Sequence, residues 1–260
     1  MSTDTQTLDE AAVCRWLEEN LPGFAGPLEV TKFQAGQSNP TFLLSTPAHD
    51  YVLRRKPPGT LLKSAHAVDR EFRVQKALAD SQVPVARMHL LCEDESVIGS
   101  MFYVMDHVPG RNFNDPTLPE LTPAERGAVM DEMNGVLAAL HEVDIDAVGL
   151  SDYGPPGNYF ERQVGRWSKQ YRASETEPQP DMDALMQRLV EELPKDDGQR
   201  TLVHGDYRID NMIFDTHGTA CRAVLDWELS TIGHPFADLA AVIMQWQMPV
   251  GAEGRGLAGV

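Results

Sequence analysis

One short segment constrains the fold of this chain more than any other: the run HGDYRIDN, from His204 to Asn211. Apolar, β-prone runs flank it, TLV before and MIF after, and the next such run, CRAVLDW, includes Asp226. Short strands on both sides of polar residues hold those side chains in fixed positions. We therefore expect Asp206, Asn211 and Asp226 to meet at one cleft.

The spacing within this segment matches the needs of phosphoryl transfer. That reaction uses one carboxylate to orient the attacking hydroxyl, and a further Asn and Asp to hold Mg²⁺ on the nucleotide phosphates. Asp206 and Asn211 follow the pattern H-x-D-x-x-x-x-N, and Asp226 comes fifteen residues later on the next predicted hairpin. The HGD run alone would favour a plain surface turn, because Asp and Asn commonly cap loops. The full set of three favours catalysis.

Charge and composition exclude several classes of protein. The 260 residues carry 22 Lys and Arg against 39 Asp and Glu, a net charge of −17, which disfavours a nucleic-acid partner. The three cysteines form no Cys-x-x-Cys pair, so a zinc ribbon and a secreted disulfide framework are not expected. The N-terminus is acidic and polar, unlike a signal peptide, and no apolar run is long enough to span a bilayer. We expect a cytoplasmic protein without a membrane partner.

The pattern of apolar residues divides the chain into two parts, a strand-rich part over residues 1–107 and a helical part over 108–260. A helix is predicted within the first part at Ala67–Asp80, with Glu71 at the edge of its apolar stripe and leaning toward the sheet. The other predicted strands and helices are these: strands at Leu28–Phe33, Thr41–Thr46, Tyr51–Arg55, Met88–Glu93 and Met101–His107, and helices from Thr122 to His141, at Tyr159–Ala173, Met182–Leu193 and Phe236–Gln247.

Two of these helices carry more specific expectations. TPAE at Thr122–Glu125 has a threonine N-cap, a proline at the first position and a glutamate that completes a capping box. The last helix repeats apolar residues at helical spacing. Its expected buried side consists of Leu239, Val242, Ile243 and Trp246.

Taken together, HGDYRIDNMIF and VLDWELSTIGHPFADLA resemble the aminoglycoside phosphotransferase and choline kinase family, a branch of the kinase-like fold. GQSNPTFLL, YVLRRKPPG, AVDREFRV and NYFERQVGRWSKQY resemble most closely the domains related to those fused to acyl-CoA dehydrogenases. The resemblance runs from about Phe33 to Trp246. It implies an α+β, bilobal, protein-kinase-like fold, with a small antiparallel-sheet N-lobe and a mainly helical C-lobe.

The resemblance also implies roles for residues around the motif. Asp206 would be the catalytic base or hydroxyl-orienting group, and Asn211 and Asp226 would hold Mg²⁺. His204 would brace the loop rather than react, since the carboxylate already supplies a proton acceptor. Asp238 would hydrogen-bond the backbone of the catalytic loop. Trp227 would pack where kinases place the Phe after their metal-binding Asp.

In the first part, the resemblance implies a binding site for ATP. The loop with Gly36, Gln37 and Ser38 would cover the phosphates with backbone N–H groups. Arg54 stands where the family often has Lys and would bind phosphate while paired with Glu71. The segment Leu53–Lys76 supports this with seven basic residues against two acidic ones.

Two further expectations concern the strands on either side of this site. Asp106 and Val108 would meet the adenine edge through the backbone of the hinge between the lobes. Arg55 points to the opposite face of its strand from Arg54 and is expected to be solvated. No Walker A sequence is present, so a P-loop is not expected.

These observations favour an ATP-dependent phosphotransferase acting on a hydroxyl of a small molecule, with a hydroxy acid or hydroxyacyl-CoA as acceptor by analogy. One alternative is an aminoglycoside- or choline-type kinase. Another is a nucleotide-binding protein without transfer activity, because the chain ends soon after the Asp238 helix, where the family continues with helices that wall the acceptor site. A metal-dependent phosphoesterase using His204, Asp206, Asn211, Asp226 and His234 is a third. The sequence does not indicate the oligomeric state.

Overall fold

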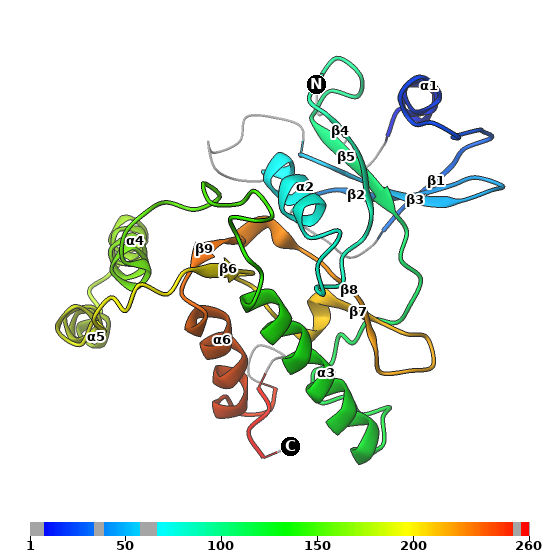
Figure 1. Ribbon diagram of the computed structural model, residues 1–260. Helices are drawn as coiled ribbons and strands as arrows, with labels where there is room; N and C mark the ends of the chain where they lie inside the picture. Colours follow the sequence, from blue (N-terminus) through cyan, green and yellow to red (C-terminus); the bar gives the residue numbers. More distant parts are fainter. Residues whose placement is uncertain (1–7, 34–38, 58–66, 252–255, 260) are drawn as a thin grey trace.

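The structure of the chain is a computed structural model that describes residues 8–33, 39–57, 67–251 and 256–259. Figure 1 shows an antiparallel sheet with two helices beside it, joined to a part made mainly of helices. The predicted α+β class, with a small sheet lobe and a helical lobe, is confirmed. Among the described residues, no helix combines the length and the apolar character needed to cross a bilayer.

The sheet has five strands in the order β1-β2-β3-β5-β4, and every neighbouring pair is antiparallel. Each strand end lies within one residue of its predicted position, because alternating apolar residues between turn residues mark strands clearly. The strands are β1 (Glu29–Lys32), β2 (Thr41–Ser45), β3 (Asp50–Arg55), β4 (Met88–Cys92) and β5 (Phe102–Asp106).

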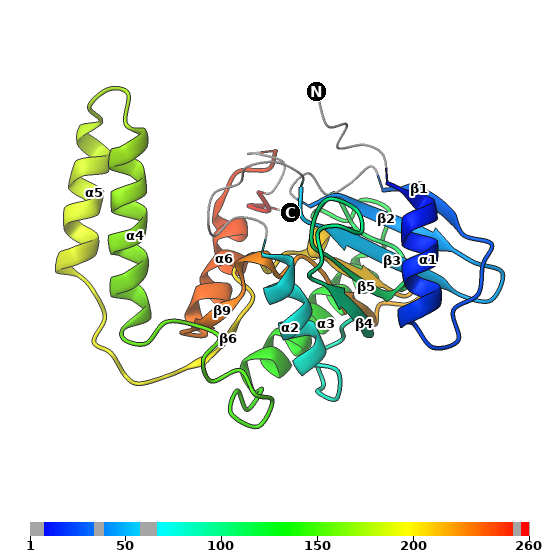
Figure 2. The same ribbon diagram turned by 90° about the horizontal axis from the view of Figure 1, so that it is seen from above.

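Both faces of the sheet are covered by helices. In the central strand β3, Leu53 belongs to a buried cluster with residues of α1 (Glu10–Asn20), and Val52 to a cluster with residues of α2 (Val68–Ala77). Helix α2 was predicted, but α1 was not. Helix α1 begins after Asp9, whose side chain accepts a hydrogen bond from the backbone in the first turn. Figure 2 shows α1 lying across the strands.

Burial of Arg55 corrects one prediction. Arg55 was expected to be solvated, but only 4% of it is exposed. Its Cα partner in β5 is Phe102, which is fully buried in the α1-side cluster. Arg54 and Arg55 point to opposite faces of β3 as predicted, but both faces of this central strand are covered. Burial lowers the pKa of the Arg55 guanidinium.

The helical part is built around α3 (Pro123–His141), and its start follows the predicted capping box. Thr122 Oγ1 accepts from Glu125 N at 3.3 Å, and Glu125 Oε2 accepts from Thr122 N at 2.8 Å. The buried residues of α3 share one face: Val129, Met133, Val136, Leu137 and Leu140. They pack in the largest buried cluster with Leu202 and Trp227, which ties the strands near the His204–Asn211 segment to α3.

Short strands surround the motif. β6 (Thr201–Val203) pairs with β9 (Thr231–Gly233), and β7 (Met212–Phe214) pairs with β8 (Cys221–Val224). The single turn η1 (Ile209–Asn211) ends the His204–Asn211 segment, and the single turn η2 (Trp227–Leu229) follows Asp226. These two strand pairs place the loop after β6 beside the loop after β8.

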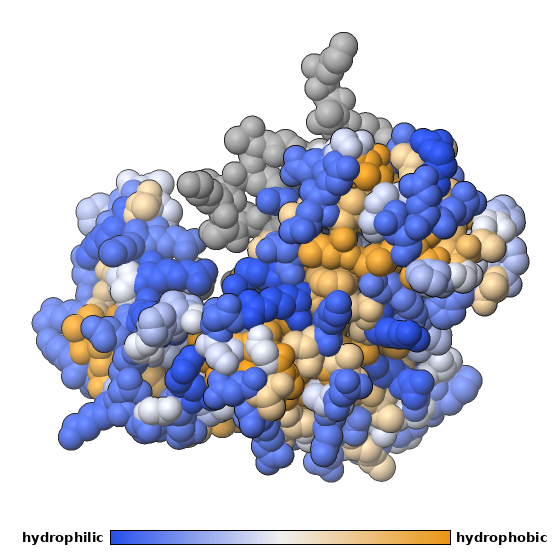
Figure 3. Space-filling model, turned by 45° about the horizontal axis from the view of Figure 1, so that its top comes forward, coloured by the Kyte–Doolittle hydropathy of each residue, from blue (hydrophilic) through white to orange (hydrophobic). Residues whose placement is uncertain are grey.

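The helices α4 (Tyr159–Ser174) and α5 (Pro180–Glu191) form a hairpin at one side of the molecule, as Figure 2 shows. Neither helix has a buried residue. Trp167 is 55% exposed. This side, at the left in Figure 3, is mostly hydrophilic with scattered apolar residues.

The buried side of α6 (Phe236–Gln247) differs from the prediction. Leu239, Ile243 and Trp246 are 37%, 50% and 43% exposed, whereas Asp238 and Gln245 are buried. Asp238 and Gln245 are seven residues apart and therefore share one face, which also includes the partly buried Val242. Hydrogen bonds to Asp238, described below, hold this face inward. The helix is thus rotated by about one residue relative to the apolar pattern.

Candidate active site

The loop between β6 and β7 holds Asp206 from several directions. Asn211 Nδ2 donates to the backbone oxygen of Asp206 at 2.9 Å and to its Oδ2 at 3.0 Å. Arg208 Nε lies 3.2 Å from Oδ1 of the same carboxylate. The side chain of Asp206 nevertheless remains 32% exposed. The carboxylate is fixed in orientation and still reachable from solvent.

Asp238 holds the backbone of this loop. Its two carboxylate oxygens accept from the N–H groups of His204 and Gly205, both at 2.8 Å. His141 Nε2 lies 3.2 Å from the same carboxylate, which is only 1% exposed. Gly205 has φ of +85°, and a Cβ there would lie 2.7 Å from the carbonyl oxygen of Leu229, so only glycine fits. The contact between Asp238 and the loop backbone matches the arrangement that the family resemblance implied.

His204 is fully buried, and its ring bonds indicate a bracing role. Nε2 lies 2.9 Å from the carbonyl oxygen of Leu225, and Nδ1 accepts from the backbone N–H of Asp206 at 3.2 Å. These partners assign the proton to Nε2. Burial lowers the pKa of His204, which keeps the ring neutral. The ring also packs 4.7 Å from that of Trp227, which is itself fully buried.

Asp226 lies beside Asn211 because Leu225 N donates to the carbonyl oxygen of Asn211 at 2.8 Å. Asp226 adopts left-handed backbone angles, φ 63° and ψ 59°, uncommon for a residue other than glycine. The amide nitrogen of Asn211 is used on Asp206, so its amide oxygen remains as a ligand atom. An amide oxygen and a carboxylate are hard oxygen donors of the kind that Mg²⁺ prefers. The residues present therefore fit a magnesium site.

Arg54 joins the sheet to this pair of loops. Its Nε lies 2.9 Å from Glu71 Oε2, and its Nη2 donates to Asp226 Oδ1 at 2.6 Å. The predicted pairing of Arg54 with Glu71 therefore forms, and the same guanidinium also reaches the expected metal ligand. Burial opposes the charge on Arg54, but Tyr103, Glu71 and Asp226 outweigh it and raise its pKa.

Glu71 is almost completely enclosed, with 1% of the residue exposed. Besides Arg54, it accepts from Asn39 Nδ2 at 2.8 Å and from the Tyr103 hydroxyl at 3.0 Å. Burial raises the pKa of Glu71 to about 7, against the opposing influence of Arg54 and Tyr103. Asn39 and Tyr103 were not among the predicted site residues. Their only signals were that Asn39 follows the glycine loop and that Tyr103 lies in a predicted strand.

Arg208 was also missed, although it lies inside the motif. Its Nη2 is 3.1 Å from Asp210 Oδ2, so the guanidinium bridges the carboxylates of Asp206 and Asp210. The side chain is 14% exposed, and its Nη1 is buried without a hydrogen-bond partner among the described residues. Arg208 thus places positive charge directly beside Asp206.

The remaining predicted residues lie elsewhere. Gly36, Gln37 and Ser38 fall outside the described residues. Asp106 ends β5, its backbone N–H donates to the carbonyl oxygen of Arg87 at 2.9 Å, and its carboxylate contacts two histidines rather than the catalytic loop. Val108 packs against the α2-side cluster.

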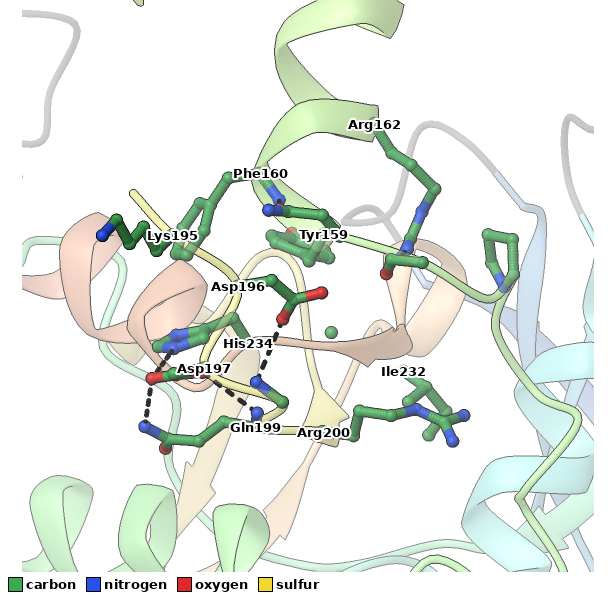
Figure 4. A pocket seen from close by; sticks show the side chains of 15 residues that line it. Tyr159, Phe160, Arg162, Lys195, Asp196, Asp197, Gln199, Arg200, Ile232 and His234 are labelled. Carbon is green, nitrogen blue, oxygen red and sulfur yellow. Dashed lines mark hydrogen bonds and ion pairs between the residues drawn. The ribbon is translucent and has the colours of Figure 1, made fainter. Parts of the chain in front are cut away.

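A separate pocket lies between the start of α4, the segment 195–200 and β9 (Figure 4). Its lining includes the cations Arg162, Lys195 and Arg200. His234 also lines it, with Nε2 3.3 Å from Asp197 Oδ2, so this histidine is not grouped with Asp206. With His204 bonded to a carbonyl and His234 in this pocket, the ligand set of a phosphoesterase is not assembled.

The chain is similar to known proteins over most of its length. The phosphotransferase enzyme family matches residues 29–257. The chain is 48% identical over 238 residues to mouse acyl-CoA dehydrogenase family member 10 and, also over 238 residues, to human family member 11. These matches cover 90% and 89% of this chain but only 22% and 30% of the two relatives. The chain thus spans less than a third of the length of these curated relatives.

Solved structures show the same fold. A crystal structure from Ralstonia eutropha jmp134, assigned as an aminoglycoside phosphotransferase, is 51% identical with a TM-score of 0.88, covering 98% of this chain and 74% of that one. The aminoglycoside phosphotransferase APH(4)-Ia, in complex with AMP-PNP and hygromycin B, is 20% identical with a TM-score of 0.64, covering 91% and 77%. The second likeness concerns the fold alone. The predicted kinase-like fold is confirmed, and the chain belongs to the phosphotransferase enzyme family.

Proposed function

We propose that this chain transfers the γ-phosphoryl group of ATP to a hydroxyl of a small molecule. The observation that carries the proposal is the contact of Arg54 with both Glu71 and Asp226, beside an Asp206 oriented by Asn211. Phosphoryl transfer depends on positioning and on charge stabilisation more than on covalent chemistry. A cation, a hydroxyl-orienting carboxylate and a pair of oxygen ligands meet that need.

Each residue has a proposed role. Asp206 orients the acceptor hydroxyl and takes its proton, while Arg208, whose Nε lies 3.2 Å from Asp206 Oδ1, fixes the orientation of the carboxylate. Asn211 and Asp226 would hold Mg²⁺, which supplies positive charge to the nucleotide phosphates when bound. Arg54, positioned by Glu71, would bind those phosphates. The proposed backbone contacts to the nucleotide come from a further set: Gly36, Gln37 and Ser38 over the phosphates, and Asp106 and Val108 at the adenine.

For the acceptor, we infer an anionic hydroxy acid or hydroxyacyl-CoA. The relatives named above are acyl-CoA dehydrogenase family members. We assign the acceptor to the side of the molecule with α4, where Arg162, Arg166 and Lys169, together with Glu161, line a shallow groove. Despite the net charge of −17, the three basic side chains would attract an anion and disfavour a cationic aminoglycoside.

We also retain the division into a nucleotide-binding lobe at 1–107 and a catalytic lobe at 108–260, together with a cytoplasmic location. The break at Asp106 and His107 agrees with the end of the five-stranded sheet. All three cysteines are free thiols, which suits a reducing compartment.

The decisive experiment combines an acceptor panel with a variant of Asp206. Formation of ADP from Mg-ATP would be measured with hydroxy acids, hydroxyacyl-CoA thioesters, aminoglycosides and choline. Asp206→Asn should lower the rate at least about 100-fold, since the amide cannot accept the proton. The matched control is Asp215→Asn, which alters an acid 3.4 Å from Arg222 in the next hairpin.

Full activity of Asp206→Asn would contradict the mechanism. Thermal stabilisation by Mg-ATP without ADP formation across the whole panel would instead favour a nucleotide-binding protein without transfer activity.

A further inference from the structure

A second cluster of ligand-type side chains lies on the sheet, outside the proposed active site. His49 Nε2 is 2.9 Å from Asp106 Oδ1, and His89 Nε2 is 2.5 Å from the same oxygen. One donor atom from each of the three residues lies within 4.8 Å of the others. Two imidazoles and one carboxylate therefore converge on a volume about the size of a metal ion.

The backbone holds both histidines in place. His49 ends the turn between β2 and β3, where Thr46 Oγ1 accepts from its N–H at 3.0 Å and donates to its carbonyl oxygen at 2.7 Å. His89 lies where the pairing of β4 with β5 shifts by one residue, between Met88 and Leu90. Such a bulge redirects a side chain. Here the redirected ring meets Asp106.

Tyr51 packs against both histidine rings. Its ring centroid lies 4.5 Å from that of His49 and 5.4 Å from that of His89, both in edge-to-face geometry. An aromatic contact on each imidazole restricts its rotation. Few rearrangements would then be needed for the two nitrogens to bind one ion.

The cluster lies on the other face of the sheet from the phosphate-binding residues. Asp106 is the Cα partner of Tyr51, which belongs to the α1-side cluster, and directly paired residues share a face. Arg54 instead contacts Glu71 of α2, on the opposite face. The side chain of Asp106 can therefore bind a ligand on this face even if the backbone of Asp106 contacts adenine.

We propose that His49, His89 and Asp106 bind a divalent transition-metal ion of the zinc type. Imidazole nitrogens select zinc and its neighbours over Mg²⁺ and Ca²⁺, which prefer oxygen ligands. Three protein ligands leave one position of a tetrahedral ion for water. The side chain of His49 is 47% exposed, which gives the ion a route from solvent. A bound ion would tie the β2–β3 turn to β4 and β5 at the point where the chain leaves the sheet.

The test is a calorimetric titration of the metal-free full chain, without an affinity tag, with ZnCl₂ in excess Mg²⁺. The excess Mg²⁺ is added to fill the proposed oxygen-ligand site at Asn211 and Asp226, so that zinc does not bind there. We expect one zinc ion per chain, with the affinity lowered at least about tenfold in His49→Ala and in His89→Ala. His217→Ala, which removes an exposed histidine in the turn between β7 and β8, should bind zinc like the unaltered chain.

X-ray absorption at the zinc edge keeps the test independent of how well the variants fold. The spectrum of the unaltered chain should show two imidazole ligands on the ion. Failure of the unaltered chain to bind zinc, full affinity in both histidine variants, or a spectrum without imidazole ligands would each overturn the proposal.

Discussion

The network around Arg54 and the hairpin of α4 and α5 differ in how far their side chains are buried. Glu71 has three side-chain partners and is 1% exposed, whereas neither hairpin helix has a buried residue. Side chains with several buried partners keep one arrangement, because any other would leave charges unpaired. The residues proposed to bind phosphate are therefore held in place by one another, while the hairpin proposed to face the acceptor presents its residues to solvent.

Helix α6 has both a buried side and an exposed side within its twelve residues. Asp238 on its inner side binds the backbone of the loop between β6 and β7, while Ile243 on another side is 50% exposed. The difference implies that substitutions on the two sides have very different costs.

The largest effect is expected on the inner side. The carboxylate of Asp238 accepts hydrogen bonds from two backbone N–H groups. Asp238→Asn replaces one of its oxygens with an NH₂ group, so that one buried N–H group loses its acceptor. We expect the free energy of unfolding to fall by about 3 to 5 kcal/mol, measured by urea denaturation.

The matched control is Ile243→Ser on the exposed side of the same helix. It should change the free energy of unfolding by less than about 0.5 kcal/mol. Equal losses of unfolding free energy in the two variants would show that the outer side of α6 is covered in solution. The two sides of the helix would then not differ as described.

The raised pKa of Glu71 makes the stability contributed by the buried network depend on pH. Burial raises this pKa to about 7 from an ordinary value of 4.5. The folded chain therefore binds more protons than the unfolded chain between these values. The contribution of Glu71 to stability is greatest below pH 4.5 and declines as the pH rises to 7.

Relative to Glu71→Gln, the unaltered chain should lose about 3 kcal/mol of stability across that window. Urea unfolding of both proteins at a series of pH values from 4.5 to 8 measures the difference. A difference that stays constant or grows with pH would mean that Arg54 keeps the carboxyl group charged throughout.

The smallest effect is expected on the hairpin. Arg166 is exposed on α4, and Arg166→Glu should raise the KM of an anionic acceptor by about threefold to tenfold while leaving the KM of ATP unchanged. Arg188→Glu on α5 is the control, because Arg188 pairs only with the exposed Glu192 among the described residues. Equal KM changes in both variants would indicate a general charge effect, and a lower KM would indicate a cationic acceptor.

The sequence predicted those features that depend on neighbouring residues. The capping box at Thr122, the alternation in β3 and the spacing of Asp206 and Asn211 are local patterns, and the structure contains each of them. The same local signals failed for Arg55 and for the buried side of α6, because burial depends on what packs against an element.

The residue order alone was enough to predict most of the strands and helices and the motif that carries the proposed chemistry. It did not predict that Arg54 meets Asp226, 172 residues away, or that His49 and His89 share the carboxylate of Asp106. Periodicity and capping act over a few residues along the chain, whereas these contacts arise from the crossing of elements far apart in it.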